Sequence, residues 1–166
     1  MQISNNGIKI LKSVEGCVKR AGLHVVYDDK TGMPVPTNMP LPHGATIGYG
    51  HLVRPGEKFP HGITEIAATE LLRRDIAIAE QAVRNSIVVT LTQNQFDALV
   101  ILAYNIGANN FSKSTVVKYI NNQNCHDGRY PDLRSAWFAW NKSCGHIMPG
   151  LTKRRACEWR LFNEKT

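Results

Sequence analysis

The chain has 166 residues, of which 43% are hydrophobic and 20% are charged, an ordinary composition for one globular domain with a sizeable core. A formal net charge of +7 and a pI of about 9.4 favour a polyanionic partner. Nucleic acid, an anionic membrane surface and an acidic wall polymer all fit that charge. No apolar run approaches the roughly 20 residues that a membrane helix needs, which excludes a membrane-spanning helix.

The four cysteines form neither a CxxC pair nor a dense disulfide framework. The N-terminus lacks a basic region followed by an apolar run, so we expect no secretory signal. These two features predict synthesis in a cytoplasm with reduced thiols. If the protein acts outside that compartment, a separate component must release it.

A helical pattern opens the chain over residues 4–15. Ile8, Leu11 and Val14 fall on one face, and Gly16 provides a stop. The pattern predicts a helix that ends beside this glycine.

The stretch 23–53 has a different character. The β-branched piece 25–27 is followed by turn residues over 28–32, which predicts a small irregular sheet. Four prolines within 33–44 exclude a long helix there, so we expect an exposed loop.

A long amphipathic helix is predicted after Thr64, which is suited to the N-cap. Its predicted apolar face consists of Leu72, Ile76, Ala79 and Val83, and its water-facing side chains are Arg73, Arg74 and Glu80.

A capping box, Thr92-x-x-Gln95, opens a further helix that ends near Gly107. That helix is apolar nearly all round, which is typical of a buried central helix. Shorter helices are expected at 113–122, 132–142 and 151–163, with loops at 123–131 and 143–150.

These elements predict an α+β fold in a single catalytic domain spanning 1–166. A small β-containing lobe, roughly 16–60, would pack on a mostly helical lobe made of 1–15 and 61–166. The cleft between such lobes is the default binding site.

Two carboxyl groups are candidates for acid–base chemistry on a glycosidic bond. Glu15 has Leu11 and Val14 behind it and a helix end beside it, and both features favour a protonated carboxyl. Asp29 lies in a turn-like, wetter setting that favours the ionised form, and Asp28 is its immediate rival. The alternatives are a surface glutamate and two aspartates that merely shape a turn.

Gly48 and Gly50 alternate with larger residues after Thr46. On a strand, both glycines would leave one face bare for a ligand, with the Thr46 hydroxyl on that face and His51 at its end. The alternative is a bulge or a tight corner of the sheet.

The sequence contains no HExxH metal motif and no G-x-S-x-G nucleophile motif. Cys144-x-His146 lacks the remaining ligands for zinc, so we expect neither a metal nor an organic cofactor. The three tryptophans are typical of a core. Trp140 with Asn141 is the candidate exception, because its helix is predicted to end beside the 143–150 loop.

Several segments in this order resemble the phage-type lysozymes of glycoside hydrolase family 24, the muramidase endolysins of tailed phages. They are residues 7–16, 27–29, 46–51, 92–99, 104–107, 139–142 and 149–155.

The resemblance implies a lysozyme-like fold that hydrolyses the β-1,4 bond between N-acetylmuramic acid and N-acetylglucosamine in bacterial peptidoglycan, with inversion. Glu15 matches the acid, while Asp29 and Thr46 match the residues that would position water. The substrate-binding candidates are Gly48, Tyr49, Gly50, His51, Asn105, Trp140 and Asn141. The expected protein is a monomer that needs no cofactor and binds no nucleic acid. It would stay in the host cytoplasm until a holin released it to the wall.

One departure from the family pattern concerns spacing, since 13 residues separate Glu15 from Asp29 and 16 separate Asp29 from Thr46. The insert 33–43 accounts for much of the second gap. It would either edge the cleft or form a loop with no catalytic part.

Two other functions compete with hydrolysis. A lytic transglycosylase would cut the same bond with one glutamate, and a non-catalytic basic module would bind nucleic acid or wall polymer in a salt-sensitive manner. The C-terminal helix offers basic side chains to an anionic outer-membrane surface, the alternative being a docked helix with a solvated basic face. These side chains are Lys153, Arg154, Arg155 and Arg160.

Overall fold

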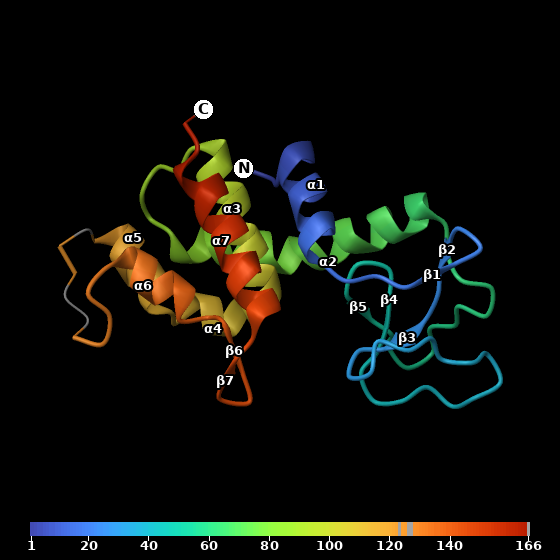
Figure 1. The fold of residues 1–166 in the computed structure, drawn as a ribbon. Coiled ribbons are helices and arrows are strands. Elements are labelled where there is room, and N and C mark those ends of the chain that lie inside the picture. The colour runs from blue at the N-terminus through green and yellow to red at the C-terminus, as the bar shows by residue number, and fades with distance from the viewer. Residues whose placement is uncertain (123, 126–127, 166) are drawn as a thin grey trace. The chain divides into compact units, whose positions relative to one another are not determined.

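A computed structural model describes residues 1–122, 124–125 and 128–165 (Figure 1). The helices are α1 (Asn5–Val14), α2 (Glu65–Ser86), α3 (Gln93–Ile106), α4 (Ala108–Ser112), α5 (Thr115–Asn121), α6 (Leu133–Phe138) and α7 (Pro149–Asn163). The strands are β1 (Lys19–Arg20), β2 (Leu23–His24), β3 (Tyr27–Asp28), β4 (Ala45–Ile47), β5 (His51–Leu52), β6 (Lys142–Ser143) and β7 (His146–Ile147).

The chain divides into two compact units. The first unit consists of Met1–Leu11 and Ile76–Thr166, and the second is Lys12–Asp75. The first is mostly helical and also holds the strands β6 and β7, whereas the second holds strands β1 to β5 and the start of α2. The fold is therefore α+β with a helical majority, as predicted.

The first unit is built around α3. Thr92 and Gln95 form the predicted capping box, and the helix ends at Gly107, whose φ of 88° few other residues adopt. Every residue from Phe96 to Ala103 is buried, so α3 is the central helix that its composition predicted. It packs most extensively against α7.

Charged side chains buried in this unit correct two predictions. Glu80 was expected to face water, but it is 9% exposed and accepts a hydrogen bond of 2.7 Å from the Ile3 backbone N–H. Arg154 and Arg155 of α7 are also buried, because both bind the buried carboxylate of Glu158. Helical periodicity alone does not reveal such partners, which lie on other turns or other elements.

Several boundaries in the first unit differ from the prediction. The short helix α4 was not expected, and the helix predicted over 132–142 ends at Phe138. The segment 143–150 is not a plain loop, because β6 and β7 form a hairpin and α7 begins at Pro149, a residue suited to the first helical turn. Of the loop predicted at 123–131, residues 123, 126 and 127 lie outside the described residues.

The second unit contains the predicted small sheet. Strands β3, β4 and β5 form an antiparallel sheet in that order, and β1 pairs with β2 in a separate hairpin. Val26, Ala45 and Ile47 form the core beneath the sheet. Thr64 caps α2 as predicted, since its hydroxyl accepts a hydrogen bond of 3.2 Å from the Ala67 N–H.

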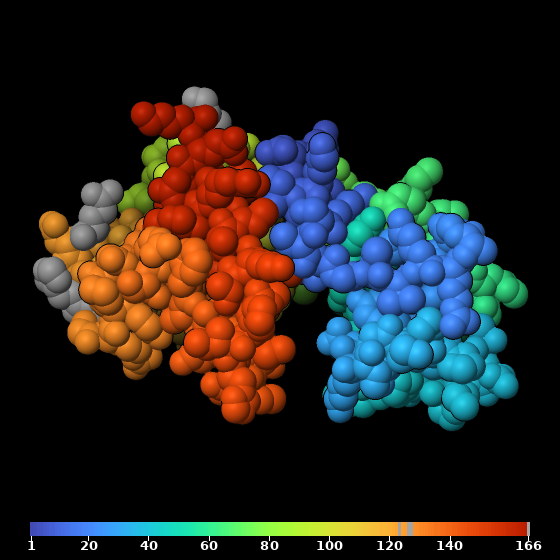
Figure 2. Space-filling model, in the orientation of Figure 1, coloured from blue at the N-terminus to red at the C-terminus, as the bar shows by residue number. Residues whose placement is uncertain are grey.

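The proline-rich insert forms no helix, as predicted, and its backbone rejoins the sheet through a bridge between Tyr27 and Pro34. Figure 2 shows this insert, coloured light blue to cyan, at the solvent-exposed surface of the second unit. Together with β2 and the 57–62 loop, it lines a groove of about 870 Å³. The insert is thus a folded surface feature of this unit.

Candidate active site

Glu15 directly follows the last residue of α1, as the predicted helix end required. It lies on a short connection between α1 and β1 that has no regular secondary structure. The side chain is half-buried.

Tyr27 lies next to the segments that carry the three predicted catalytic residues. It lies on β3 directly opposite Thr46 of β4, and its hydroxyl donates a hydrogen bond of 3.4 Å to the carbonyl of Gly16, the residue after Glu15. Burial raises the pKa of Tyr27 to about 12, and the negative charges of Asp29 and Glu15 add to the rise. Glu15, Asp29 and Thr46 therefore all belong to the second unit, on segments next to Tyr27, and their role in catalysis stays a prediction.

The two neighbouring aspartates differ in their contacts. The Asp28 carboxylate accepts a hydrogen bond of 2.9 Å from the Lys30 N–H, and the Asp28 backbone bonds to Gly32 and Met33 across the turn. Asp28 thus shapes the turn in the way that aspartate commonly does. Asp29 is exposed at the start of that turn, in the wetter setting predicted for the second carboxylate.

Thr46 is only 5% exposed, and its hydroxyl donates a hydrogen bond of 2.9 Å to the Gly44 carbonyl. That bond uses the one O–H donor and fixes the side chain. The oxygen retains lone-pair capacity for a hydrogen bond from water.

The prediction that Gly48 and Gly50 leave a strand face bare is wrong. Residues 48–50 form the turn between β4 and β5, with φ of 65° at Gly48 and 91° at Gly50. The two glycines permit these positive φ values, and Gly48 also lies against Ala68, where an added Cβ would sit 3.4 Å from the alanine Cβ. The tight corner, left open by the sequence, is the observed arrangement.

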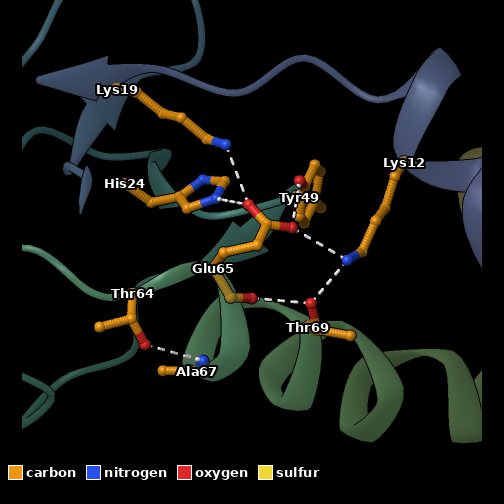
Figure 3. Close-up of polar contacts among 8 residues, drawn as sticks. All are labelled: Lys12, Lys19, His24, Tyr49, Thr64, Glu65, Ala67 and Thr69. Atoms are coloured by element: carbon orange, nitrogen blue, oxygen red, sulfur yellow. Dashed lines mark hydrogen bonds and ion pairs between the residues drawn. The ribbon is translucent and has the colours of Figure 1, made fainter. Parts of the chain in front are cut away.

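Glu65 was missed by the sequence analysis. It is the first residue of α2, and four side chains hydrogen-bond to its carboxylate, as Figure 3 shows. These donors are Lys12, Lys19, His24 and Tyr49. Burial alone would raise the pKa of Glu65, but the hydrogen bonds outweigh it and hold the pKa far below its usual range.

No sequence signal marked Glu65, because an acidic residue in the first turn of a helix is common for local reasons. Its bond to Tyr49 bears on a predicted substrate contact. Tyr49 is 8% exposed, and its hydroxyl donates to Glu65 at 2.7 Å. Burial and this hydrogen bond both raise the pKa of Tyr49. The side chain therefore has a structural role inside the second unit, and a role in substrate binding stays a prediction.

His51 is held between two carboxylates. Its Nδ1 lies 2.8 Å from Asp75 and its Nε2 lies 2.9 Å from Glu57, and the ring is 5% exposed. Burial would lower the pKa of His51, but the two hydrogen bonds outweigh it and raise the pKa. These contacts give His51 a structural role, and a role in substrate binding stays a prediction.

Three further candidates lie in the first unit. The Asn105 side chain accepts a hydrogen bond of 2.7 Å from Arg155, which ties α3 to α7. Trp140 is half-buried and its carbonyl accepts a bond of 3.2 Å from the same arginine, while Asn141 donates to Thr152 at 3.3 Å. Their predicted substrate contacts stay predictions.

The basic face expected on α7 is smaller than the sequence indicated. Because Arg154 and Arg155 are buried against Glu158, only Lys153 and Arg160 of the four proposed basic residues are exposed. A surface that depends on all four cations is therefore ruled out. Across the described residues, none of the helices combines the length and apolarity required to span a bilayer.

The α+β architecture with a helical majority is the one expected of a lysozyme-like protein. Residues 12–158 match the family profile described as phage lysozyme, and the chain belongs to that family. The resemblance noted in the sequence is confirmed.

Relatives of known name include the endolysin of Salmonella phage P22, which is 36% identical over 165 residues, 98% of each chain. The endolysin of Bacillus phage PZA is 37% identical over 169 residues. This chain spans only 57% of the PZA protein and 54% of the related endolysin of Bacillus phage B103.

Solved structures agree with these matches. The muramidase domain of SpmX from Asticaccaulis excentricus aligns with a TM-score of 0.73 and 31% identity over 99% of both chains. A mutant of P22 lysozyme aligns with a TM-score of 0.72 and 33% identity, also over 99% of both chains.

Proposed function

We propose that this chain is a muramidase endolysin, which hydrolyses the β-1,4 bond between N-acetylmuramic acid and N-acetylglucosamine in bacterial peptidoglycan. The observation that carries the proposal is the presence of all three candidate residues in one unit, on segments next to Tyr27. They are a half-buried glutamate, an exposed aspartate and a threonine whose hydroxyl is fixed by a hydrogen bond. Membership of the phage lysozyme family supports the same activity.

In the proposed reaction, Glu15 donates its proton to the leaving glycosidic oxygen. Asp29, in the ionised form, takes a proton from an attacking water, and the Thr46 oxygen accepts a hydrogen bond from the same water. Water then adds to the sugar carbon opposite the departing group. The residues therefore favour inversion, and the first sugar released from a β bond is the α anomer.

The test is a digest of purified cell wall with the wild type and with Glu15→Gln. Loss of a general acid removes about two to four orders of magnitude in rate, so we expect at least a hundredfold fall in released reducing sugar with unchanged melting temperature. Glu70→Gln, the same change at an exposed position on α2, is the matched control. A folded Glu15→Gln enzyme with wild-type activity would contradict the assignment.

Product masses distinguish the proposal from a lytic transglycosylase. Hydrolysis leaves a reducing N-acetylmuramic acid that is heavier by one water than the 1,6-anhydro product. Proton NMR of the earliest products reads the anomer and checks inversion. Anhydro products would replace the proposed reaction with transglycosylation.

The proposal also covers setting and partners. Peptidoglycan is the only partner it requires, with the protein acting as a monomer and reaching the wall from the host cytoplasm through a separate holin. Free thiols at all four cysteines support assembly in a reducing compartment. Lysis of cells only on co-expression with a holin would support this route.

A further inference from the structure

Glu65 has as many hydrogen-bonding partners as a carboxylate can readily accept. Its Oε1 accepts from Lys12 Nζ at 2.9 Å and from Tyr49 at 2.7 Å. Its Oε2 accepts from Lys19 Nζ at 2.9 Å and from His24 Nε2 at 2.8 Å. Two donors on each oxygen use about four lone-pair sites, so the carboxylate has no site left for a further donor.

The two lysines lie on either side of Glu15 in the sequence. Lys12 is in the last turn of α1 and Lys19 is the first residue of β1. Both ends of the connection that carries Glu15 are therefore bound to one carboxylate, as Figure 3 shows for the two lysines. The connection itself forms no helix or strand, and its backbone is otherwise held by hydrogen bonds to the carbonyls of Gly16 and Val18.

Further contacts fix the positions of Glu65 and the two lysines. His24 is fully buried and pairs with Lys19 across the β1–β2 hairpin, so both strands of the hairpin reach Glu65. The Lys12 ammonium also donates to Thr69 at 2.6 Å and lies 5.1 Å from the centre of the Tyr49 ring. Thr69 in turn donates to the Glu65 carbonyl at 2.7 Å.

The arrangement is better suited to positioning than to stability. The side chains of Lys19 and Glu65 are 42% and 47% exposed, and an ion pair between side chains this exposed contributes little to the free energy of unfolding. A general acid, by contrast, is sensitive to placement, since an error of about 1 Å costs on the order of a hundredfold in rate.

We propose that Glu65 is a positioning residue, which holds the Glu15 carboxyl in place for proton transfer by binding Lys12 and Lys19 on either side of it. The inference rests on the proposed role of Glu15 as the acid. Glu65 itself contacts neither the reacting bond nor the water. Its loss leaves Lys12 and Lys19 without their shared counter-charge and weakens the attachment of both ends of the connection.

The test is Glu65→Gln, assayed on purified wall with kcat and KM measured separately. We expect kcat to fall about 10- to 100-fold while KM changes less than threefold, because the chemical step alone is affected. Glu65→Asp, which retains the charge, should recover part of the loss. Glu70→Gln on the same helix should leave both parameters unchanged.

A double-mutant cycle separates positioning from a general structural effect. If Glu65 acts through Lys19, then Glu65→Gln should lower kcat much less in a Lys19→Met background than in the wild type. The Lys19 side chain is 42% exposed, so Lys19→Met should fold by itself. This variant should lower kcat even if Glu65→Gln does not fold.

The outcomes are distinct. If Glu15→Gln is inactive while a folded Glu65→Gln has wild-type kcat, the positioning role is wrong and the proposed function stands. If Glu15→Gln is active, the proposed function fails first. A lower melting temperature with unchanged kcat, or fully additive losses in the cycle, would also overturn the positioning role.

Discussion

At the scale of single residues, the pair Asp28 and Asp29 offers a sharp comparison. Asparagine in place of Asp28 retains a side-chain oxygen that can accept the Lys30 N–H, so Asp28→Asn should keep the turn and most of the activity. Asp29→Asn removes the charge proposed to activate water and should lower kcat about a hundredfold or more. Wall digestion by the two purified variants measures both. Equal losses would reassign the second carboxylate.

His51 gives a prediction about pH. A neutral imidazole has one N–H, whereas the doubly protonated form can donate to both of the carboxylates that face its ring nitrogens. The pKa of His51 is raised above its ordinary 6.5, so the stability it contributes is fully present below pH 6.5 and is lost as pH rises through the higher folded value. The pKa of Glu57 is lowered from 4.5, so the stability that Glu57 contributes is present above pH 4.5 and is lost as the pH falls through the lower folded value.

The expected window of greatest stabilisation therefore lies between about pH 4.5 and 6.5. There, His51→Gln should lower the free energy of unfolding by about 2 to 3 kcal/mol, and the deficit should shrink as the solution becomes alkaline. Urea unfolding at several pH values measures this. His61→Gln, at an exposed histidine, is the control, and a deficit that does not vary with pH would refute the account.

At the scale of elements, α7 is joined to its neighbours by a buried charge cluster. The Glu158 carboxylate binds Arg154 at 3.2 Å, Arg155 at 2.7 Å and the Trp137 N–H at 3.0 Å. Glu158→Gln removes the carboxylate charge that pairs with two buried guanidinium groups and should cost about 3 to 5 kcal/mol. Thermal or urea unfolding measures this loss, and Glu164→Gln, at an exposed residue directly after α7, is the control. A loss below about 1 kcal/mol would contradict the burial of the cluster.

The elements also divide by how well local sequence predicted them. The start of α3 was predictable because its capping box involves residues three apart. The 48–50 turn was not, because alternating glycines fit both a strand and a tight turn, and only the pairing of β4 with β5 distinguishes them. The buried state of Glu80 depends on a partner 77 residues away.

At the scale of the whole molecule, the net charge of +7 predicts salt-sensitive binding to walls that carry acidic polymers. Raising the salt from about 0.02 M to about 0.2 M shortens the Debye length roughly threefold, so KM should rise severalfold with little change in kcat. Walls stripped of those polymers provide the control and should respond less. An equal response on both substrates would remove charge attraction as the cause.

The sequence by itself determined the long helices, the α+β class and the family, and it proposed three residues for catalysis. Each of these depends on short-range patterns or on motifs in a fixed order. Only the tertiary structure decided which charges are exposed and which are paired. Glu65, His51 and Glu158 all gained their roles from several partners, some of them distant along the chain. The physical reason is that a charge can be buried or fixed only where opposite charges and hydrogen-bond donors lie next to it in space. The spacing of residues along the chain does not specify which of them come into contact.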